Sequence, residues 1–221
     1  PKAVLAKELP DPETRLSYSV FGQAFDELHF LEPSALRMAY THPMDDGQER
    51  TFKVKFEGEG VDDYGGPYRE FFSQVVEELQ SKIGESNSGY NVDRSAPNNV
   101  TSCVLPLLVP CPNQQKSTGE NQKHFVLNPS TVRSYAGSAQ LYTEMYSFLG
   151  QIIGIALRSR VHLSLAFPSN IWKVLVGERL DFSDLINYDE SICSILRTLL
   201  SFLSKDADAT STAMMKDTLT E

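Results

Sequence analysis

The stretch that decides the fold reads Phe52-Lys53-Val54-Lys55-Phe56, then Glu57 and the turn Gly58-Glu59-Gly60-Val61-Asp62-Asp63-Tyr64-Gly65-Gly66, then Pro67. Phe52, Val54 and Phe56 recur at the strand period of two, so one face of this segment is expected to be buried. The glycines permit positive φ, and Pro67 suits the first turn of a helix, where its missing N–H costs nothing. The stretch therefore predicts a strand over residues 52–56, a turn, and a helix that begins near Pro67.

The helix after Pro67 carries an apolar stripe that must pack on something. Its members are Phe71, Phe72, Val75, Val76 and Leu79. A glycine-rich turn between a strand and a helix could also cradle a phosphate, but a P-loop needs Gly-Lys-Ser/Thr, and the dinucleotide fingerprint needs a third glycine where this chain has Asp63. The acidic side chains of the turn would repel a phosphate, and they are out of register for a calcium loop. We therefore expect neither a cofactor nor a metal ion.

The composition bounds the partners and the compartment. A net charge of −9 argues against nucleic acid or an anionic membrane surface as the main partner. The three cysteines, Cys103, Cys111 and Cys193, form no CxxC pair and leave an odd one over, so neither a disulfide framework nor a zinc site is indicated. The N-terminus lacks an apolar signal region. These features predict a globular protein in a reducing compartment, the cytoplasm.

Helical spacing of apolar residues predicts most of the remaining structure. Helices are expected over residues 16–30, shortly after Pro33, over 141–158, from Ser169 as N-cap to a stop at Gly177, and from about Asp189 after a turn at 181–185. The 141–158 helix is expected to be central. Its polar interruptions, and Gly150 and Gly154, which allow close helix packing, argue against a membrane span. The buried face of the last helix is expected to be Ile192, Ile195, Leu196, Leu199, Leu200 and Leu203.

Residues 84–123 are rich in Asn, Ser, Gly, Gln and Pro, which predicts a long polar loop at the surface, with much of 86–99 mobile. The apolar run 104–109 interrupts it. An irregular strand is expected there, paired with residues 124–127, although Pro106 confines it to an edge or a bulge.

The string from Phe56 to Phe72 resembles the N-lobe signature of HECT-type ubiquitin ligases. In that family a Gly-Glu pair is followed by Asp-x-Gly-Gly-x-x-Arg-Glu and an aromatic pair. The matching residues here are Gly58, Glu59, Asp63, Gly65, Gly66, Arg69, Glu70, Phe71 and Phe72. Val61 stands where many members carry glycine, and this version is more similar to the very large HERC-like ligases.

A second block resembles the same family in order and spacing. Its residues are Tyr146, Phe148, Leu149, Gly150, Gly154, Ala156, Leu163, Pro168, Trp172, Lys173, Leu175, Gly177, Asp184, Leu185, Asp189 and Leu196. The resemblance implies that residues 1–204 form the large subdomain of a HECT N-lobe, mainly α with a few short β-strands. The conjugating-enzyme docking subdomain and the catalytic C-lobe are expected to be absent. Falling apolar content predicts a frayed tail over 205–221.

The resemblance also implies a chemistry and its partners. In HECT ligases a C-lobe cysteine accepts ubiquitin from a conjugating enzyme (E2) as a thioester and passes it to a lysine of a protein substrate. Cys103, after Thr101 and Ser102, faintly resembles the Thr-Cys stretch of that lobe. It precedes the 141–158 helix, however, whereas the catalytic cysteine of the family follows it. We therefore expect no catalytic residue in this chain and no activity from it alone.

The residues singled out are thus expected to have structural roles. Gly65, Gly66 and Pro67 should set the turn, Arg69 and Glu70 should tie it down by ion pairs, and Trp172 should fill the core. One alternative stays open: a non-catalytic interaction module that grips a partner protein through residues 86–122.

Overall fold

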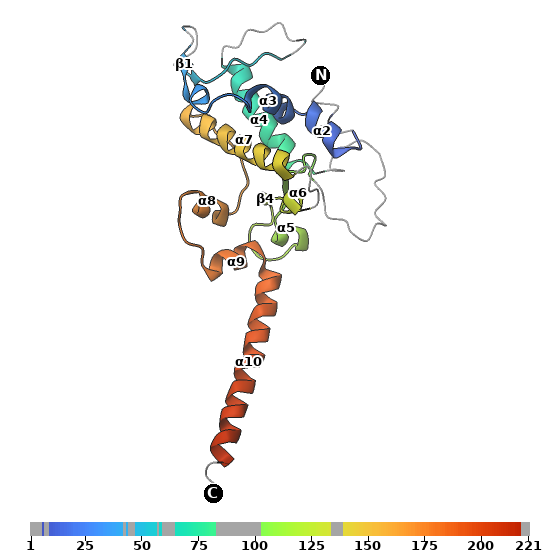
Figure 1. The fold of residues 1–221 in the computed structure, drawn as a ribbon, viewed down its shortest axis with the longest axis vertical. Helices are drawn as coiled ribbons and strands as arrows, with labels where there is room; N and C mark the ends of the chain where they lie inside the picture. The colour runs from blue at the N-terminus through green and yellow to red at the C-terminus, as the bar shows by residue number, and fades with distance from the viewer. Residues whose placement is uncertain are drawn as a thin grey trace. The chain divides into compact units, whose positions relative to one another are not determined.

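A computed structural model of the chain describes residues 6, 9–41, 43, 47–56, 58, 65–82, 103–133 and 139–217, with residues 205–217 described by their backbone alone. The described part is mainly helical and has two small antiparallel sheets of two strands each, β1 with β2 and β3 with β4 (Figure 1). The predicted fold class is therefore confirmed. The chain divides into two compact units, unit 1 (Pro1–Pro110 and Phe125–Ala166) and unit 2 (Cys111–His124 and Phe167–Glu221).

Unit 1 holds most of the elements. They are α2 (Pro12–Tyr18), α3 (Val20–Leu28), the 3-10 helix η1 (Ala35–Arg37), β1 (Tyr40–Thr41), β2 (Glu49–Arg50), α4 (Gly66–Gln80), β3 (Leu108–Pro110), β4 (Phe125–Leu127), α6 (Ser130–Arg133) and α7 (Ala139–Arg158). Unit 2 consists of α5 (Pro112–Lys116), α8 (Ser169–Leu175), α9 (Phe182–Tyr188) and α10 (Glu190–Asp217).

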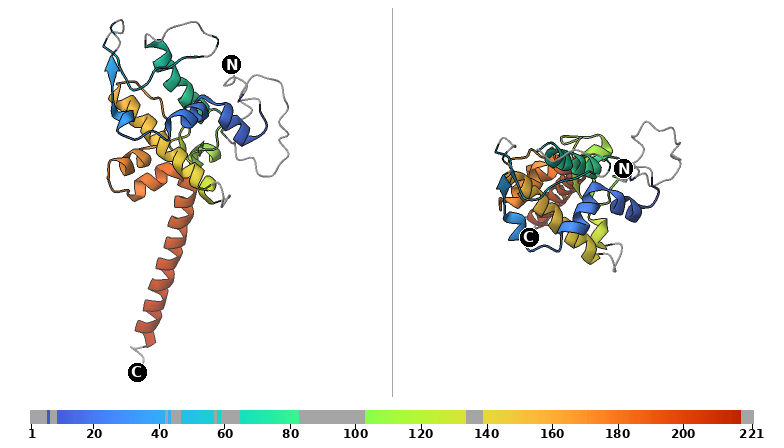
Figure 2. Two further views of the ribbon diagram at one scale, coloured as in Figure 1. Left: turned by 45° about the horizontal axis from the view of Figure 1, so that its top comes forward. Right: turned by 90° about the horizontal axis from the view of Figure 1, so that it is seen from above.

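The core of unit 1 forms where α3 meets α4 and α7 (Figure 2). The predicted stripe of α4 is confirmed, because all five of its apolar residues are buried. Phe148 of α7 lies edge-on to Phe21 and to Phe25 of α3, with ring centroids 5.6 Å apart in each pair. Glu78 of α4 is buried and accepts the N–H groups of Val20 and Phe21 at 2.8 and 3.1 Å. A carboxylate of one helix thus satisfies the free donors at the start of another.

The strand predicted over residues 52–56 is wrong, because the structure assigns no β-strand there. The alternation itself is present: Phe52, Val54 and Phe56 are half-buried, and the two lysines between them are exposed. Phe52 packs on α4, with its ring centroid 5.3 Å from Tyr68 and 5.2 Å from Phe71. Packing on a helix therefore accounts for the apolar period of two without a β-ladder.

The helix predicted over residues 16–30 is two helices, α2 and α3, separated at Ser19. The hydroxyl of Ser19 donates to Leu16 O at 2.6 Å and accepts the N–H of Gly22 at 2.9 Å, so it caps α3. A Cβ at Gly22 would lie 1.8 Å from Leu16 O. The close approach of the two helices therefore requires glycine at this position.

Part of the 84–123 segment belongs to the core. Residues 83–102 lie outside the described residues, and with them the predicted mobile part. Strand β3 pairs antiparallel with β4 in the register Leu108↔Leu127, which confirms a pairing between the apolar run and residues 124–127. The surface loop is otherwise wrong over 103–113, because Leu105, Leu107 and Cys111 are fully buried, and residues 112–116 form helix α5.

The predicted central helix is confirmed as α7, Ala139–Arg158. Close packing at Gly150 and Gly154 is wrong, since a Cβ at either position would meet nothing within 4 Å. Arg158 Nη2 donates to Arg37 O at 2.7 Å, so this side chain ties η1 to the end of α7. None of the helices in the described ranges is both long and apolar enough to cross a bilayer.

Unit 2 departs most from the sequence expectations. Gly177, with φ of 76°, ends α8 as predicted, but Pro168 takes the N-cap position and Ser169 is the first helical residue. The predicted turn over 181–185 is wrong, because helix α9 starts at Phe182. Trp172 does not fill a core. It is 39% exposed, with its ring 5.5 Å from that of Phe167, because α8 is short and buries none of its side chains completely.

Helix α10 begins at Glu190, where the sequence predicts its start. Its predicted buried face is wrong, since the six residues on that face are between 39% and 65% exposed. The backbone stays helical to Asp217, whereas the sequence predicts a frayed tail from residue 205. The apolar spacing predicted the helix correctly but not the burial of its apolar face, because burial depends on which segments pack against that face.

Candidate functional site

The start of α4 is held by backbone geometry and by one tyrosine. Gly65 takes the N-cap position with φ of 95°, a left-handed conformation that favours glycine, and Pro67 lies in the first turn as predicted. The buried hydroxyl of Tyr68 lies 2.9 Å from Ser159 Oγ and accepts the N–H of Thr51 at 3.3 Å. One side chain thus connects α4 to the chain just after α7.

The predicted motif residues are only partly described. Gly58 has φ of 86°, as a tight turn requires, while Glu59 and Asp63 lie outside the described residues. Arg69 donates from Nε and Nη2 to Gln48 Oε1 at 3.3 and 3.1 Å, and Glu70 accepts from Gln74 Nε2 at 3.0 Å. These partners are neutral amides, so the ion pairs expected between Arg69, Glu70 and the turn stay a prediction.

Gln48 and Ser159 were missed by the sequence analysis. Gln48 Nε2 donates to the backbone oxygen of Ser159 at 2.6 Å, while Gln48 Oε1 accepts from Arg69. Ser159 is buried and also meets Tyr68. The sequence holds no signal for this cluster, because its members come from three distant segments.

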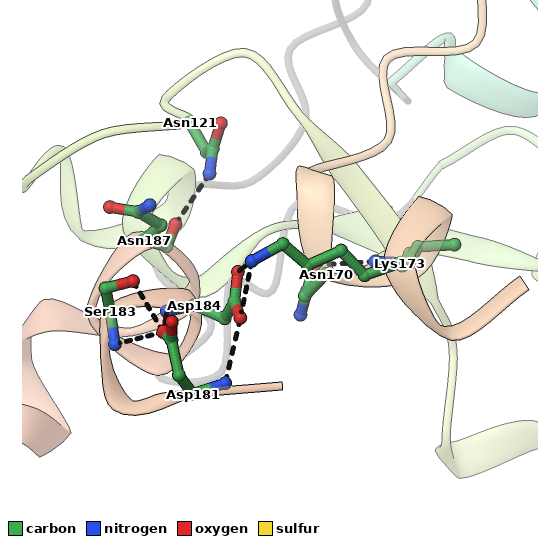
Figure 3. Close-up of polar contacts among 8 residues, drawn as sticks. Asn121, Asn170, Lys173, Asp181, Ser183, Asp184 and Asn187 are labelled. Carbon is green, nitrogen blue, oxygen red and sulfur yellow. Dashed lines mark hydrogen bonds and ion pairs between the residues drawn. The ribbon is translucent and has the colours of Figure 1, made fainter. Parts of the chain in front are cut away.

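A polar network joins α8 to α9 in unit 2, as Figure 3 shows. Lys173 Nζ lies 2.8 and 3.0 Å from the two carboxylate oxygens of Asp184, whose side chain is almost fully buried. Asp184 Oδ2 also accepts the N–H of Asp181, and Asp181 Oδ1 accepts the N–H of Asp184 in return. This reciprocal capping box starts α9.

These contacts perturb the charges of the network. The hydrogen bond from the Ser183 hydroxyl, followed by the backbone N–H of Asp184, lowers the pKa of Asp181 below its ordinary value. The hydrogen bond to Asp184 raises the pKa of Lys173. Both directions favour the charged forms, as expected of a capping and ion-pair network rather than of a proton-transfer site.

Helix α5 is fastened to the junction of α9 and α10 by Asn113, which is fully buried. Its Nδ2 donates to Ile186 O and Asn187 O at 3.1 Å each, and its Oδ1 accepts the N–H of Glu190 at 2.8 Å. Asn121 Nδ2 adds a bond to Asn187 O at 2.8 Å (Figure 3). One asparagine therefore serves the end of α9 and the start of α10 together.

The three cysteines are the candidate nucleophiles, and all three are buried: Cys103 is 3% exposed, and Cys111 and Cys193 are 0% exposed. Cys111 Sγ donates to Tyr188 O at 3.2 Å, and burial raises the pKa of this thiol. A buried thiol with a raised pKa is a poor nucleophile, because the thiolate is the reactive form. Within the described ranges, no three His, Cys, Asp or Glu side chains are grouped to hold a metal ion.

Comparison with known proteins gives these observations a context. Residues 99–218 match the family described as HECT-domain (ubiquitin-transferase). The chain is 33% identical over 172 residues to E3 ubiquitin-protein ligase HERC2 of Mus musculus and 32% identical over 172 residues to HERC2 of Homo sapiens. It is 34% identical over 130 residues to the probable E3 ubiquitin-protein ligase HECTD4 of Homo sapiens. No solved structure matches the chain significantly.

The extent of these matches decides what they show. Each HERC2 match covers 78% of this chain but only 3% of the relative, and the HECTD4 match covers 59% of this chain and 2% of that protein. A match over 172 of 221 residues leaves at most 49 outside it, so it necessarily includes α4 and its motif. The family match covers more than half of the chain, including α7 to α9. This chain therefore belongs to the HECT-domain (ubiquitin-transferase) family.

Proposed function

We propose that the chain is the large subdomain of the N-lobe of a HECT-type E3 ubiquitin ligase. It serves as the platform that holds a conjugating-enzyme docking subdomain and a catalytic C-lobe, and it transfers no ubiquitin alone. Family membership supports this role, as do relatives that are named as ubiquitin-protein ligases and of whose length the chain spans about 3%. The partners are a ubiquitin-charged E2, ubiquitin and protein substrates in the cytoplasm.

The observation that carries the proposal is the burial of every cysteine in the chain. A HECT ligase carries ubiquitin as a thioester, so its acceptor thiol must be reached by the C-terminus of ubiquitin on a charged E2. Cys103, Cys111 and Cys193 lack that exposure. The acceptor is then a cysteine of the ligase outside these 221 residues.

The exposed apolar face of α10 also favours a platform role. Ile192, Ile195 and Leu199 are 47%, 59% and 53% exposed, and they share a face with three further exposed leucines. Soluble proteins rarely expose a contiguous apolar patch of this kind unless another surface covers it. In the complete ligase, a further part of the HECT domain covers this face.

A charging assay on the 221-residue chain tests the proposal. The chain is incubated with ubiquitin, activating enzyme and several E2s, and the products are separated with and without reducing agent. We expect no reducible ubiquitin adduct. Alkylation before and after denaturation is the folding control, with three thiols protected in the native chain and all three reactive afterwards. A reducible adduct that disappears in Cys103→Ala would overturn the proposal.

The interaction-module alternative gains no support from the described residues. Of the segment 86–122, residues 86–102 lie outside the description, and residues 103–113 lie largely in the interior of their own units. The side chain of Asn113 in α5 uses both of its polar atoms in hydrogen bonds to α9 and α10. Residues 103–113 are therefore a poor surface for gripping a partner, whereas residues 115–117, 119, 120 and 122 are exposed.

A further inference from the structure

A polar cleft of about 280 Å³ lies in unit 1 beside the start of α4. Three arginines line it: Arg69 from the second turn of α4, Arg158 at the end of α7, and Arg160 just beyond. Among the described residues, the rest of the lining consists of Gly47, Gln48, Glu49 and Ser159. Three guanidinium groups face one carboxylate, on a chain whose net charge is −9.

The arginines are held on a fixed frame. The hydrogen bond between Tyr68 and Ser159, at 2.9 Å, connects the helix that carries Arg69 to the segment that carries Arg158 and Arg160. Gln48 bridges the same two segments, since it accepts from Arg69 and donates to Ser159 O. This frame fixes the backbone positions of the three arginines, and the bonds of Arg69 to Gln48 and of Arg158 to Arg37 O order two of the guanidinium groups before a ligand arrives, which reduces the entropy lost on binding.

Arg160 is the arginine with the most unused capacity. Its side chain makes no hydrogen bond or ion pair with the described residues, whereas Arg69 donates to Gln48 and Arg158 donates to Arg37 O. Its φ of 54° belongs to the turn that ends α7, where the N–H of Val161 donates to Ala156 O at 2.8 Å, and this turn sets where Arg160 leaves the helix. The five donors of a guanidinium match the oxygens of a phosphate or carboxylate.

The charge and lining of the cleft select the ligand. Among the described residues of the lining, the three arginines and Glu49 sum to a charge of +2, which a phosphate monoester neutralises, because it carries about −1.5 to −2 at neutral pH. Of the lining residues that the structure describes, none has an aromatic or aliphatic side chain on which a nucleobase could stack. The overall negative charge disfavours a polyanion such as nucleic acid.

We infer that the arginine cleft binds a phosphorylated serine or threonine of a protein segment. A volume of about 280 Å³ is several times the roughly 30 Å³ that a water molecule occupies in the liquid, which leaves room for the phosphate and the side chain that carries it. This inference rests on the residues of the cleft alone, and it holds whether or not the chain is part of a ligase.

An NMR titration of the arginine Nε–H signals tests the inference on the 221-residue chain. The probe is a pentapeptide with one phosphoserine between alanines, compared with its serine version and with inorganic phosphate. We expect the signals of Arg69 and Arg160 to shift with the phosphopeptide and not with the serine peptide. Arg160→Gln should weaken binding about tenfold or more, since it removes a charge-assisted bidentate contact.

The control variant is Arg179→Gln, which removes the same charge from an exposed position in unit 2. It should change the affinity less than twofold, and circular dichroism should show both variants folded. Absence of shifts at Arg69 and Arg160, or equal effects of the two variants, would overturn the site. Inorganic phosphate that binds as tightly as the phosphopeptide would overturn the assignment to a protein segment.

Discussion

Tyr68 shows how a single residue sets the geometry of the family motif. Its ring is fully buried and lies edge-on to Phe72, with centroids 5.1 Å apart. Its hydroxyl is shared between Ser159 Oγ and the N–H of Thr51. The residue therefore combines apolar packing on α4 with a polar link to the far end of α7, and the arginine cleft depends on that link.

Replacing Tyr68 with phenylalanine keeps the packing and removes the link. We expect Tyr68→Phe to lower the free energy of unfolding by about 1–2 kcal/mol, because a buried hydroxyl of Ser159 loses its partner. Urea denaturation followed by circular dichroism measures the change. Tyr18→Phe is the matched control, since that hydroxyl makes no hydrogen bond with the described residues, and its effect should stay within about 0.5 kcal/mol. Equal losses in the two variants would show that the link contributes nothing.

Asp181 provides a test of the unit 2 network by pH. Its pKa is lowered in the folded chain, so the carboxylate contributes stability that is present above the ordinary value of 3.8 and is lost as the pH falls through the folded value. Asp181→Ala should therefore lower the melting temperature at pH 7, and the gap to the parent chain should narrow as the pH falls below 3.8. Asp26→Ala, at an exposed position of α3, is the control and should change the melting temperature little. A gap for Asp181→Ala that stays constant from pH 7 to pH 3 contradicts this account.

Among the elements, helix α4 begins with a backbone conformation that favours glycine. Gly65 adopts a left-handed conformation, and a side chain there costs about 1–2 kcal/mol. Gly150 is the comparison position, because it lies inside helix α7 and a Cβ there would meet open space. We expect Gly65→Ala to lower the free energy of unfolding by about 1–2 kcal/mol and Gly150→Ala to raise it by about 0.5–1 kcal/mol, since alanine is the better helix former. Urea melts that give the same sign for both variants would rule out the turn geometry as the cause.

The sequence predicted elements best where local signals suffice. The stripe of α4, the extent of α7 and the start of α10 follow from apolar spacing and from proline and aspartate at helix starts, which neighbouring residues determine. The break at Ser19 had a local signal too, because serine is one of the residues preferred at the N-cap of a helix.

The features that the sequence did not predict depend on contacts between residues that are far apart in the chain. The alternation over 52–56 is typical of a strand, yet Phe52 packs on helix α4, and only the fold decides between the two. Trp172 and the face of α10 were predicted to be buried from their chemistry alone. In the candidate site, Tyr68 and Ser159 are 91 residues apart, and no spacing rule connects them.

At the scale of the whole molecule, three features support the proposal of a platform whose acceptor cysteine lies elsewhere in the ligase. The family match includes α7 to α9, the cysteines are buried, and the apolar face of α10 is exposed. If α10 is an internal support of a larger HECT domain, the chain should work when the remaining parts of that domain are supplied. Mouse HERC2, which is named as an E3 ubiquitin-protein ligase and matches this chain over 172 residues, is the protein from which we would take them.

The measurement that tests the platform proposal most directly is a charging assay on a chimera. Residues 1–204 are joined to the part of mouse HERC2 that follows the matching region, and ubiquitin transfer from charged E2s is followed on non-reducing gels. We predict a reducible ubiquitin adduct on the chimera, none on the 221-residue chain, and none after the cysteine of the added lobe is replaced by alanine. A folded chimera that never forms the adduct, under conditions in which the mouse domain does, would contradict the account.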